Sequence, residues 1–461
     1  TLAVPTEAYY GVQSSRAKEN FSITGTNLHP ELISNLARIK KAAAVVNAQS
    51  GNLAVGKKDA IVQACDEIVA GYFHEAFIVD AIQGGAGTSA NMNANEVIAN
   101  RAIEILGGRK GDYRIVHPND DVNLCQSTND VFPTAGKMTV LQLLPELIAE
   151  LEKLELALAD KAKEFAGVIK MGRTQMQDAV PTTLGRTFQA YQSFVKRDIR
   201  HLMSAAEEMK SLNLGGTAIG NAINATPEYL ENITAFVSAE VGIAFTQAED
   251  LFDATQHVDG FVRVSAAIKT AAVNLSKMSN DLRLLSSGPR AGIGEINLPA
   301  KQNGSSIMPG KVNPVIPEVV SQVAFRVIGN DLTITMAAES GQLELNAFEP
   351  IIFHSLFESI DCLAHAVATL TVNCITGIQA NEMVCYKQVE ESAGIATALC
   401  PTIGYQQASA IAKESLKTGK TVRELVLEKG LFSVEETDSI LDLKRMAGIP
   451  AELVLLAGKA V

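Results

Sequence analysis

The sequence predicts a mainly all-α chain built around a central bundle of long helices. Two observations support this prediction. Apolar residues make up 47% of the 461 residues but aromatic residues only 5%, with no tryptophan, a composition that suits packed helices better than a β-sandwich. In addition, apolar residues recur at steps of three and four over long stretches, which is the spacing that a helix–helix seam requires.

Several apolar seams in the middle of the chain define the expected bundle. They run through Leu144, Leu147, Leu151, Leu154, Leu158, Ala162 and Phe165, then Phe188, Tyr191, Val195, Ile199 and Leu202, then Phe261, Val264, Ile268, Ala271, Leu275, Met278, Leu282 and Leu285. Two further helical stretches are expected at about 318–340 and 351–376. Helices of this length exceed the usual average of about 11–12 residues and are typical of bundles. Because one chain would not bury all their apolar positions, we expect a homo-oligomer.

The flanking segments complete the predicted order of elements. Residues 1–35 lack a sustained period and are expected to form an irregular arm, with helices following at about 30–55, 58–73 and 90–106. After about residue 381 the helices shorten and the turns come closer together. We therefore expect an N-terminal mostly helical domain at 1–128, the long-helix bundle at 129–383 and a small C-terminal helical domain at 384–461.

Charge, hydropathy and cysteine content narrow the classes of function. The net charge of −12 argues against general nucleic-acid binding. No apolar run approaches the roughly 18–20 residues of a membrane helix, so no membrane association is expected. The six cysteines are scattered, as are the histidines, which predicts reduced thiols in a cytoplasmic protein and no metal site.

The segment Gly304–Asn313 is the strongest candidate for chemistry. Glycine permits close approach of the backbone to a ligand, and Pro314 and Pro317 stiffen the exit. Lys311 and Asn313 are suited to gripping a carboxylate, while Ser305 or Ser306 is suited to exchanging a proton. From the residue types alone, a solvated surface turn remains the alternative.

Three further polar segments interrupt the helical pattern. Gln83–Asn93 joins a glycine turn to a helix, where Thr88 and Ser89 would offer free amide donors to a carboxylate. Gln126–Asp130 precedes the long helices and reads equally well as a capping segment. Gly172–Pro181 lies between two of the long helical stretches.

Taken together, these segments resemble the signature sequences of the aspartase/fumarase superfamily. Gly304–Asn313 matches the pattern Gly-Ser-Ser-x-Met-Pro-x-Lys-x-Asn at every defined position, and the other segments are similar to the aspartase branch. The similarity extends over nearly the whole chain. It implies an all-α fold with a central helical core, and a homotetramer whose active sites are shared between subunits.

The resemblance also implies the chemistry. The expected reaction is the reversible elimination of ammonia from L-aspartate to give fumarate, through an aci-carboxylate intermediate and with Ser305 as the base. By residue-for-residue similarity, the β-carboxylate meets Thr88, Ser127, Thr128 and Ser306; the α-carboxylate meets Lys311 and Asn313; and the amino group meets Asn129, Thr174 and Gln175. No cofactor is required on this reading, and activation by a divalent cation is left open.

Three alternatives remain on sequence grounds. His117–Asp121 is closer to class II fumarases, which favours a fumarate hydratase, whereas Gln175 stands where that branch has a histidine. A lyase for a related amino diacid stays open because the sequence does not show the width of the pocket, and Asn221–Ala222 departs from the common pattern in a loop near the site. A catalytically silent structural homologue would be expected to lose Ser305, Lys311 or Asn313, and all three are present.

Overall fold

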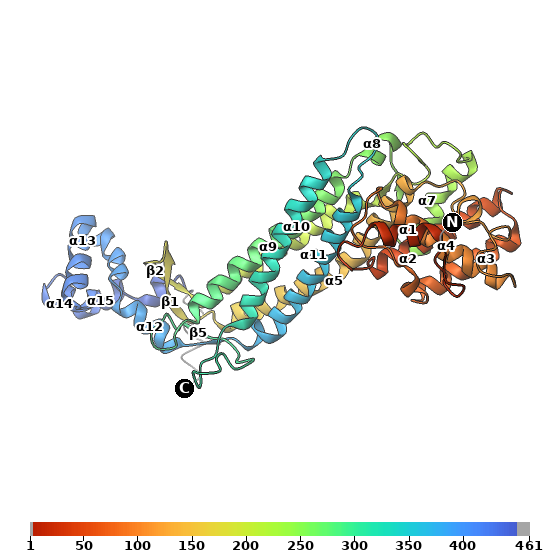
Figure 1. The fold of residues 1–461 in the computed structure, drawn as a ribbon. Helices are drawn as coiled ribbons and strands as arrows, with labels where there is room; N and C mark the ends of the chain where they lie inside the picture. The colour runs from red at the N-terminus through yellow and green to blue at the C-terminus, as the bar shows by residue number, and fades with distance from the viewer. Residues whose placement is uncertain (1–2, 450–461) are drawn as a thin grey trace. The chain divides into compact units, whose positions relative to one another are not determined.

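The computed structural model describes residues 3–449, and this part of the chain is mainly helical with three small two-stranded sheets (Figure 1). The all-α prediction is therefore confirmed. Packing divides the chain into two compact units. The first comprises Thr1–Ile148, Asp198–Ala272 and Val323–Ala364, and the second comprises Ala149–Arg197, Val273–Gln322 and His365–Val461. The division into domains 1–128, 129–383 and 384–461 stays a prediction.

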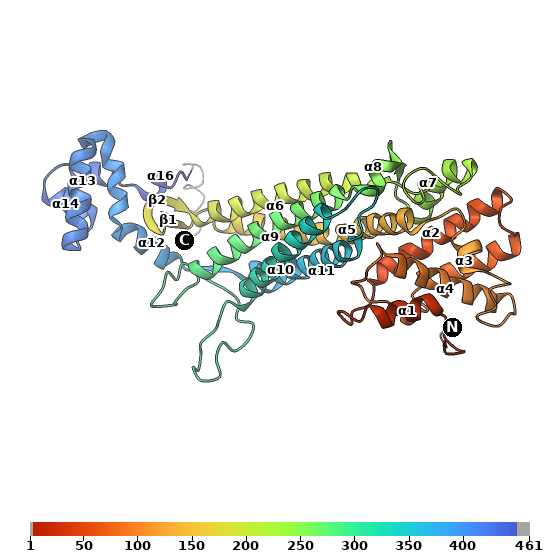
Figure 2. The same cartoon turned by 45° about the horizontal axis from the view of Figure 1, so that its top comes forward.

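The five longest helices each contribute a stretch to both units, and within each unit these stretches run side by side (Figures 1 and 2). They are α5 (Thr128–Glu164), α6 (Leu184–Ala206), α9 (Asp259–Leu285), α10 (Val315–Glu339) and α11 (Glu349–Asn373). The apolar seam expected on α9 is buried along its whole length, from Phe261 to Leu285. The seam predicted on α9 is therefore confirmed at the level of individual side chains.

The first unit adds short helices around the start of α5. These are α1 (Val12–Asn20), α2 (Pro30–Gln49), α3 (Val55–Val69), α4 (Thr88–Ile105), α7 (Pro227–Val241) and α8 (Leu251–Gln256), with single turns at His74–Ala76, Pro118–Val122 and Glu207–Lys210. Strands β3 (Ser211–Leu212) and β4 (Thr246–Gln247) pair in parallel. Helices α2, α3 and α4 pack on one another, and α7 packs on α2.

Helix α1 lies in the segment that the sequence predicted to be irregular, so that expectation is wrong. The carboxylate of Glu96 accepts hydrogen bonds from the backbone N–H groups of Gly11, Gln13 and Ser14 over 2.8–3.0 Å. A negative charge at a helix N-terminus satisfies donors that have no partner within the helix. The helix thus depends on a residue distant in sequence.

The second unit carries a hairpin and the C-terminal helices. Strands β1 (Ile169–Thr174) and β2 (Gln177–Thr183) are antiparallel, as are β5 (Ile296–Asn297) and β6 (Gln379–Ala380). The helices are α12 (Glu382–Glu391), α13 (Cys400–Thr418), α14 (Val422–Glu428), α15 (Val434–Ile440) and α16 (Leu443–Met446), with short 3₁₀ segments at Ile375–Gly377 and Ala393–Leu399. Figure 2 shows the long loop that joins α9 to α10 and contains Gly304–Asn313.

One helix is long and apolar enough to span a membrane, although the sequence was expected to contain no such segment. Glu349–Gly377 is long and apolar enough to cross a membrane by length and composition, and 61% of its most apolar window is buried within the protein. The core helix of a folded domain passes the same test. The sequence-based statement considered unbroken apolar runs, whereas this stretch is apolar only on average.

Candidate active site

Thr88 begins helix α4 directly after a glycine turn. Gly87 has a φ of 85°, and a Cβ at this position would lie 2.3 Å from the ring of Phe132 on α5. Glycine is therefore needed both for the backbone angle and for the close approach of the two helix starts. The backbone N–H of Thr88 donates to the Gly85 carbonyl over 2.9 Å, so the amide of Thr88 is not free as expected. What Thr88 offers to a ligand is its exposed side chain.

A reciprocal cap orders the start of helix α5. Ser127 Oγ accepts from the backbone N–H of Asn129 over 3.2 Å, and Asp130 Oδ1 accepts from the backbone N–H of Ser127 over 2.9 Å. Asp130 Oδ2 also accepts from two backbone N–H groups of the turn 215–217. Burial raises the pKa of Asp130 to about 6, although these hydrogen bonds act in the opposite direction. The capping interpretation is confirmed, and the cap fixes the three candidate residues 127–129.

A buried chain of amides connects Thr128 to helix α4. Asn91 Nδ2 donates to Thr128 Oγ1 over 3.1 Å and to Asn123 Oδ1 over 3.2 Å. Lys40 Nζ donates to the same Asn123 oxygen over 2.6 Å, and burial lowers the pKa of Lys40 to about 7. Because Thr128 Oγ1 accepts from Asn91, the hydroxyl proton of Thr128 can be donated to an anion.

Asn129 is oriented by the loop that follows β3. Its Nδ2 donates to the Ala218 carbonyl over 2.8 Å, and Asn213 Nδ2 donates to the Asn129 carbonyl over 3.0 Å. With the NH₂ group used in this way, Oδ1 is the end of the amide that can accept from an ammonium group. The pair Asn221–Ala222 lies in the same loop, three residues beyond Ala218.

Thr174 and Gln175 lie at the exposed tip of the β1–β2 hairpin. Thr174 pairs with Gln177, which leaves Gln175 and Met176 as a two-residue turn with φ values of 51° and 65°. Such turns ordinarily use Asn or Gly, because other residues lose roughly 1–2 kcal/mol each in the left-handed region. Backbone strain of this kind is typical of functional sites.

The loop Gly304–Asn313 closes on itself. The backbone N–H of Gly304 donates to the Lys311 carbonyl over 2.9 Å, and Asn313 Nδ2 donates to the Gly304 carbonyl over 2.8 Å. A Cβ on Gly304 would lie 2.5 Å from the Lys311 carbonyl oxygen, so this closure requires glycine. Lys311 is exposed and forms no ion pair with a carboxylate among residues 3–449.

Ser305 sits inside this loop with two donors directed at its side chain. Ser305 Oγ accepts from the backbone N–H of Ile307 over 3.2 Å and from that of Met308 over 3.1 Å. The neighbouring Ser306 is exposed. Backbone amides pointing at a hydroxyl oxygen stabilise that oxygen when it loses its proton, as in an oxyanion hole.

The candidate residues therefore form two groups. Thr88, Ser127, Thr128 and Asn129 belong to the first unit, where the Asn91 contact ties together helices α4 and α5. The second unit holds the remaining candidates on two separate elements, namely Thr174 and Gln175 on the hairpin and Ser305, Ser306, Lys311 and Asn313 on the loop. Neither unit alone contains the complete set.

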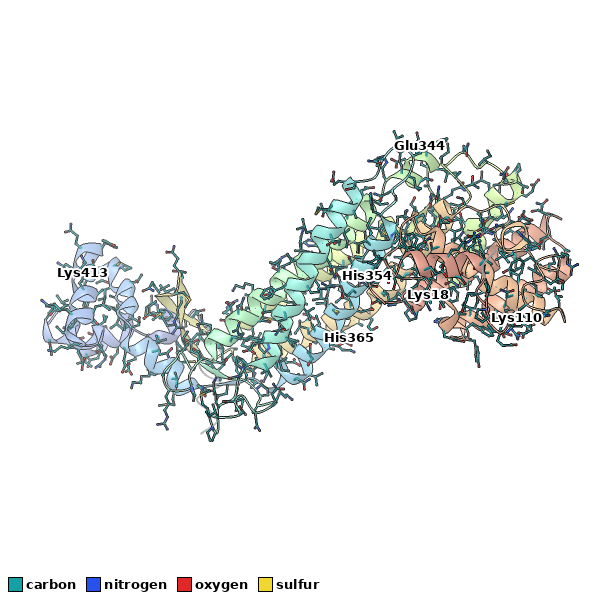
Figure 3. The ribbon with its side chains drawn as sticks, in the orientation of Figure 1. Lys18, Lys110, Glu344, His354, His365 and Lys413 are labelled. Atoms are coloured by element: carbon teal, nitrogen blue, oxygen red, sulfur yellow. The ribbon has the colours of Figure 1, made fainter. Side chains whose placement is uncertain are left out.

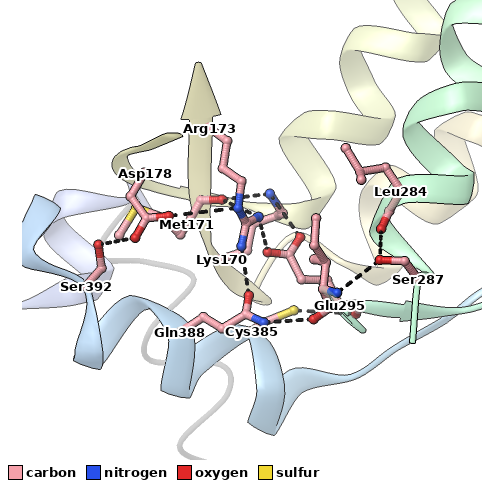
Figure 4. Close-up of polar contacts among 11 residues, drawn as sticks. Lys170, Met171, Arg173, Asp178, Leu284, Ser287, Glu295, Cys385, Gln388 and Ser392 are labelled. Carbon is pink, nitrogen blue, oxygen red and sulfur yellow. Dashed lines mark hydrogen bonds and ion pairs between the residues drawn. The ribbon is translucent and has the colours of Figure 1, made fainter. Parts of the chain in front are cut away.

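Sequence reasoning assigned no role to three charged residues behind these groups. Asp130 and Lys40 are fully buried in the first unit, and Glu295 is fully buried in the second, where it contacts Arg173 (Figure 4). The signal in the sequence was weak: Lys40 adjoins a second lysine, Asp130 ends a polar run, and Glu295 is a single charged residue in a glycine-rich stretch.

The remaining histidines and acids do not add a further cluster. His354 and His365 both lie on α11 (Figure 3). Asp121, which departs from the aspartase pattern, is paired with Lys57 over 2.7 Å. Within residues 3–449, His, Cys, Asp and Glu side chains form no group of three that could hold a metal ion.

Comparison with known proteins connects these groups to a family. A family model described as "Lyase" matches residues 1–329, and one described as "Fumarase C C-terminus" matches residues 395–448. An aspartate ammonia-lyase of Helicobacter pylori is 53% identical over 447 residues, which is 96% of each chain.

Solved structures agree with the sequence comparisons. The structure described as "fumarate lyase:delta crystallin" from Brucella melitensis, bound to cobalt, is 51% identical with a TM-score of 0.93, covering 96% of this chain and 97% of that one. A class II fumarase from Schistosoma mansoni is 35% identical with a TM-score of 0.94, covering 97% of both chains. The long-helix bundle, the motif segments and these matches lead to one conclusion: the chain belongs to the aspartase/fumarase superfamily of lyases.

Proposed function

We propose that the chain is an aspartate ammonia-lyase, which reversibly eliminates ammonia from L-aspartate to give fumarate. The observation that carries the proposal is the Gly304–Asn313 loop, in which two backbone amides donate to Ser305 Oγ and Lys311 is exposed. The 53% identity to a protein named aspartate ammonia-lyase supports aspartate as the substrate.

The chemistry demands hydrogen-bond donors at the β-carboxylate. The Cβ proton is very weakly acidic, and its removal places a second negative charge on that carboxylate. Catalysis therefore depends on donors that bind the dianion more strongly than the ground state. The residues assigned to this task are Thr88, Ser127, Thr128 and Ser306. The contact from Asn91 supports this assignment, because it leaves the Thr128 proton for the substrate.

Ser305 acts as the base in its alkoxide form. The alkoxide takes the proton from Cβ, the electron pair passes into the β-carboxylate to form the aci-carboxylate, and collapse of this intermediate expels ammonia from Cα. The amides of Ile307 and Met308 support the role, since hydrogen bonds to an anionic oxygen are stronger than those to a neutral one. Closure of the long loop over the substrate would exclude water from the site.

The other substrate groups are assigned to the remaining candidates. Lys311 and Asn313 hold the α-carboxylate; one N–H of Asn313 is used by the Gly304 carbonyl, which leaves the other to donate. Asn129, Thr174 and Gln175 face the amino group. The fixed amide of Asn129 supports this, since its Oδ1 end is an acceptor.

We further propose a homotetramer whose active sites are shared between subunits. Helix α10 carries exposed apolar side chains at positions that share one helix face, including Phe325 at 64%, Leu332 at 61% and Met336 at 60% exposure. A contiguous apolar face of this kind is typical of a protein–protein interface.

The proposed reaction needs no cofactor, because the charges that develop are met by side chains and backbone amides. Activation by a divalent cation is left open. The six cysteines are free thiols, which supports a cytoplasmic location.

A class II fumarase is the second candidate. It is favoured by the His117–Asp121 segment and by the 35% identity to the fumarase of Schistosoma mansoni. Gln175 argues against it, since a histidine is expected there in that branch. A related amino diacid as substrate is the remaining variant of the first proposal.

Fumarate formation, followed by ultraviolet absorbance, tests the proposal. Absorbance should rise with L-aspartate and stay flat with L-malate. A rise with L-malate alone would replace the lyase by the hydratase, and a rise with neither would favour a different amino diacid or a silent homologue.

A further inference from the structure

Arg173 connects the exposed hairpin tip to the interior of the second unit (Figure 4). Its Nη1 lies 2.5 Å from Glu295 Oε1, and its Nη2 donates to Gln388 Oε1 over 2.9 Å. Its Nε lies 3.9 Å from Asp178 Oδ1. Because the guanidinium group is planar and rigid, partners on several sides fix its orientation. Thr174 follows directly, so this anchor lies at the base of the tip.

A β-bulge directs Arg173 toward these partners. The pairing of β1 with β2 shifts register between Met171 and Arg173, which places Gly172 at the irregularity. A Cβ on Gly172 would lie 2.8 Å from the Val180 carbonyl oxygen, so the bulge also requires glycine. Bulges of this kind change the direction of a side chain and are common next to active sites.

Glu295 is the fixed end of the contact. Its side chain is fully buried, its backbone N–H donates to the Leu285 carbonyl, and its carbonyl accepts from the Asn381 N–H, both over 2.9 Å. Lys170 Nζ lies 3.1 Å from Glu295 Oε2 but donates its hydrogen bond to the Met171 carbonyl. The Oε2 atom is thus held by charge without a directed hydrogen bond.

The position of the hairpin tip suggests a role for the Arg173–Glu295 ion pair other than stabilising the fold. Replacing a buried ion pair by apolar side chains is often neutral or stabilising, so the pair is weak evidence for a stabilising role. The tip itself is exposed and has a strained turn at Gln175 and Met176. A strained segment stays in one conformation when its surroundings determine it, and Arg173 supplies that constraint.

We propose that Glu295 is a positioning residue, which holds Arg173 so that Thr174 and Gln175 meet the amino group of the substrate. The inference rests on the proposed function, in which these two residues face that group. Glu295 contacts no substrate atom in this account and acts through Arg173 alone.

The test compares three variants with the wild-type enzyme. Glu295→Gln removes the charge at nearly constant shape. Glu295→Asp keeps the charge but shortens the side chain. This second variant still tests the proposal if Glu295→Gln folds poorly. Asp331→Asn is the matched control, because Asp331 is a buried carboxylate paired with Lys269 over 2.6 Å on the bundle helices. For each protein we would measure hydrogen exchange of the peptide 169–183, kcat/KM for L-aspartate, and inhibition by succinate, which lacks an amino group.

Glu295→Gln should speed exchange in the hairpin and lower kcat/KM for L-aspartate by about tenfold or more, since misplacing a contact by about 1 Å costs up to roughly 10²-fold. Inhibition by succinate should stay within about twofold, because its carboxylates are bound elsewhere. Glu295→Asp should change the same quantities in the same direction by less, and Asp331→Asn should leave hairpin exchange unchanged.

Unchanged hairpin exchange in both Glu295 variants would overturn the inference. So would a loss of succinate inhibition equal to the loss of kcat/KM, which would indicate general damage to the site. Failure of the wild-type enzyme to release fumarate from L-aspartate would be seen before any variant is compared. That result would overturn the proposed function, and the inference with it.

Discussion

The backbone N–H of Met308 donates to Ser305 Oγ over 3.1 Å, so the serine has a donor in place before any substrate binds. A neutral serine is a poor base, and its alkoxide is unstable in water. The second amide, from Ile307, adds to the same effect. Preorganised donors of this kind lower the energy of a developing anion without further rearrangement.

Ser305→Ala should abolish turnover of L-aspartate while leaving the oligomer intact. The base then has no oxygen, and loss of a general base commonly costs about 10²–10⁴-fold in rate. Fumarate absorbance and sedimentation velocity would be measured together. Activity near that of the wild-type enzyme would remove Ser305 from the mechanism.

Gly304→Ala should lower activity by about 10²-fold with little change in Tm, because a Cβ would lie 2.5 Å from the Lys311 carbonyl and open the loop. Gly310→Asn is the matched control in the same loop. Gly310 has a φ of 78°, which Asn tolerates, and no atom lies within 4 Å of a Cβ there. Equal activities of the two variants would show that the contact between Gly304 and the Lys311 carbonyl is not needed for activity.

Lys311→Ala should weaken inhibition by succinate by about tenfold or more, since a hydrogen bond to a charged group contributes about 1.5–3 kcal/mol. Lys301→Ala, an exposed lysine earlier in the same loop, is the control for the change in net charge. An unchanged inhibition constant for Lys311→Ala would mean that another residue holds the α-carboxylate.

The sequence predicted the long helices because their evidence is local. The seam from Phe261 to Leu285 repeats at steps of three and four, and burial follows that pattern. Helix α1 was missed because its N-terminal amides are satisfied by Glu96, more than 80 residues away. The nine residues of α1 show no apolar periodicity that would predict a helix capped by Glu96.

The sequence predicted site residues only where they belong to a recognisable motif. Resemblance placed Ser305 and Lys311 in one loop, but the amides at Ser305 Oγ follow from backbone geometry that the sequence does not display. The turn at Gln175 and Met176 has no Asn or Gly, so the usual hairpin signal was absent. Arg173 and Glu295 are 122 residues apart, and nothing local to either predicts their contact.

Asp130→Asn should remove a pH-dependent part of the stability. The pKa of Asp130 is raised from 3.8 to about 6 in the folded protein, so the folded state binds this proton more tightly than the unfolded chain. The contribution is full below about pH 4 and is lost as the pH rises through 6, a change on the order of 3 kcal/mol. The Tm of the wild type relative to the variant should therefore fall between pH 4 and 7. Parallel Tm curves, or a difference that grows with pH, would contradict the assignment.

Leu332→Glu should convert the proposed tetramer to a smaller species and reduce activity. A charge on the apolar face of α10 would have to be buried without a partner on association, which is costly. Leu416→Glu, at a position 78% exposed on α13, is the control. Sedimentation velocity measures both, and an unchanged sedimentation coefficient for Leu332→Glu would exclude this face from the interface.

The most direct test of the central claim is a competition in one tube. Fumarate is incubated with the enzyme and ammonium in water, and the products are identified by NMR. If the chain is an ammonia-lyase, L-aspartate should accumulate and malate should not. Accumulation of malate in place of L-aspartate would show that the site adds water to fumarate, and would contradict the assignment of this chain as an ammonia-lyase.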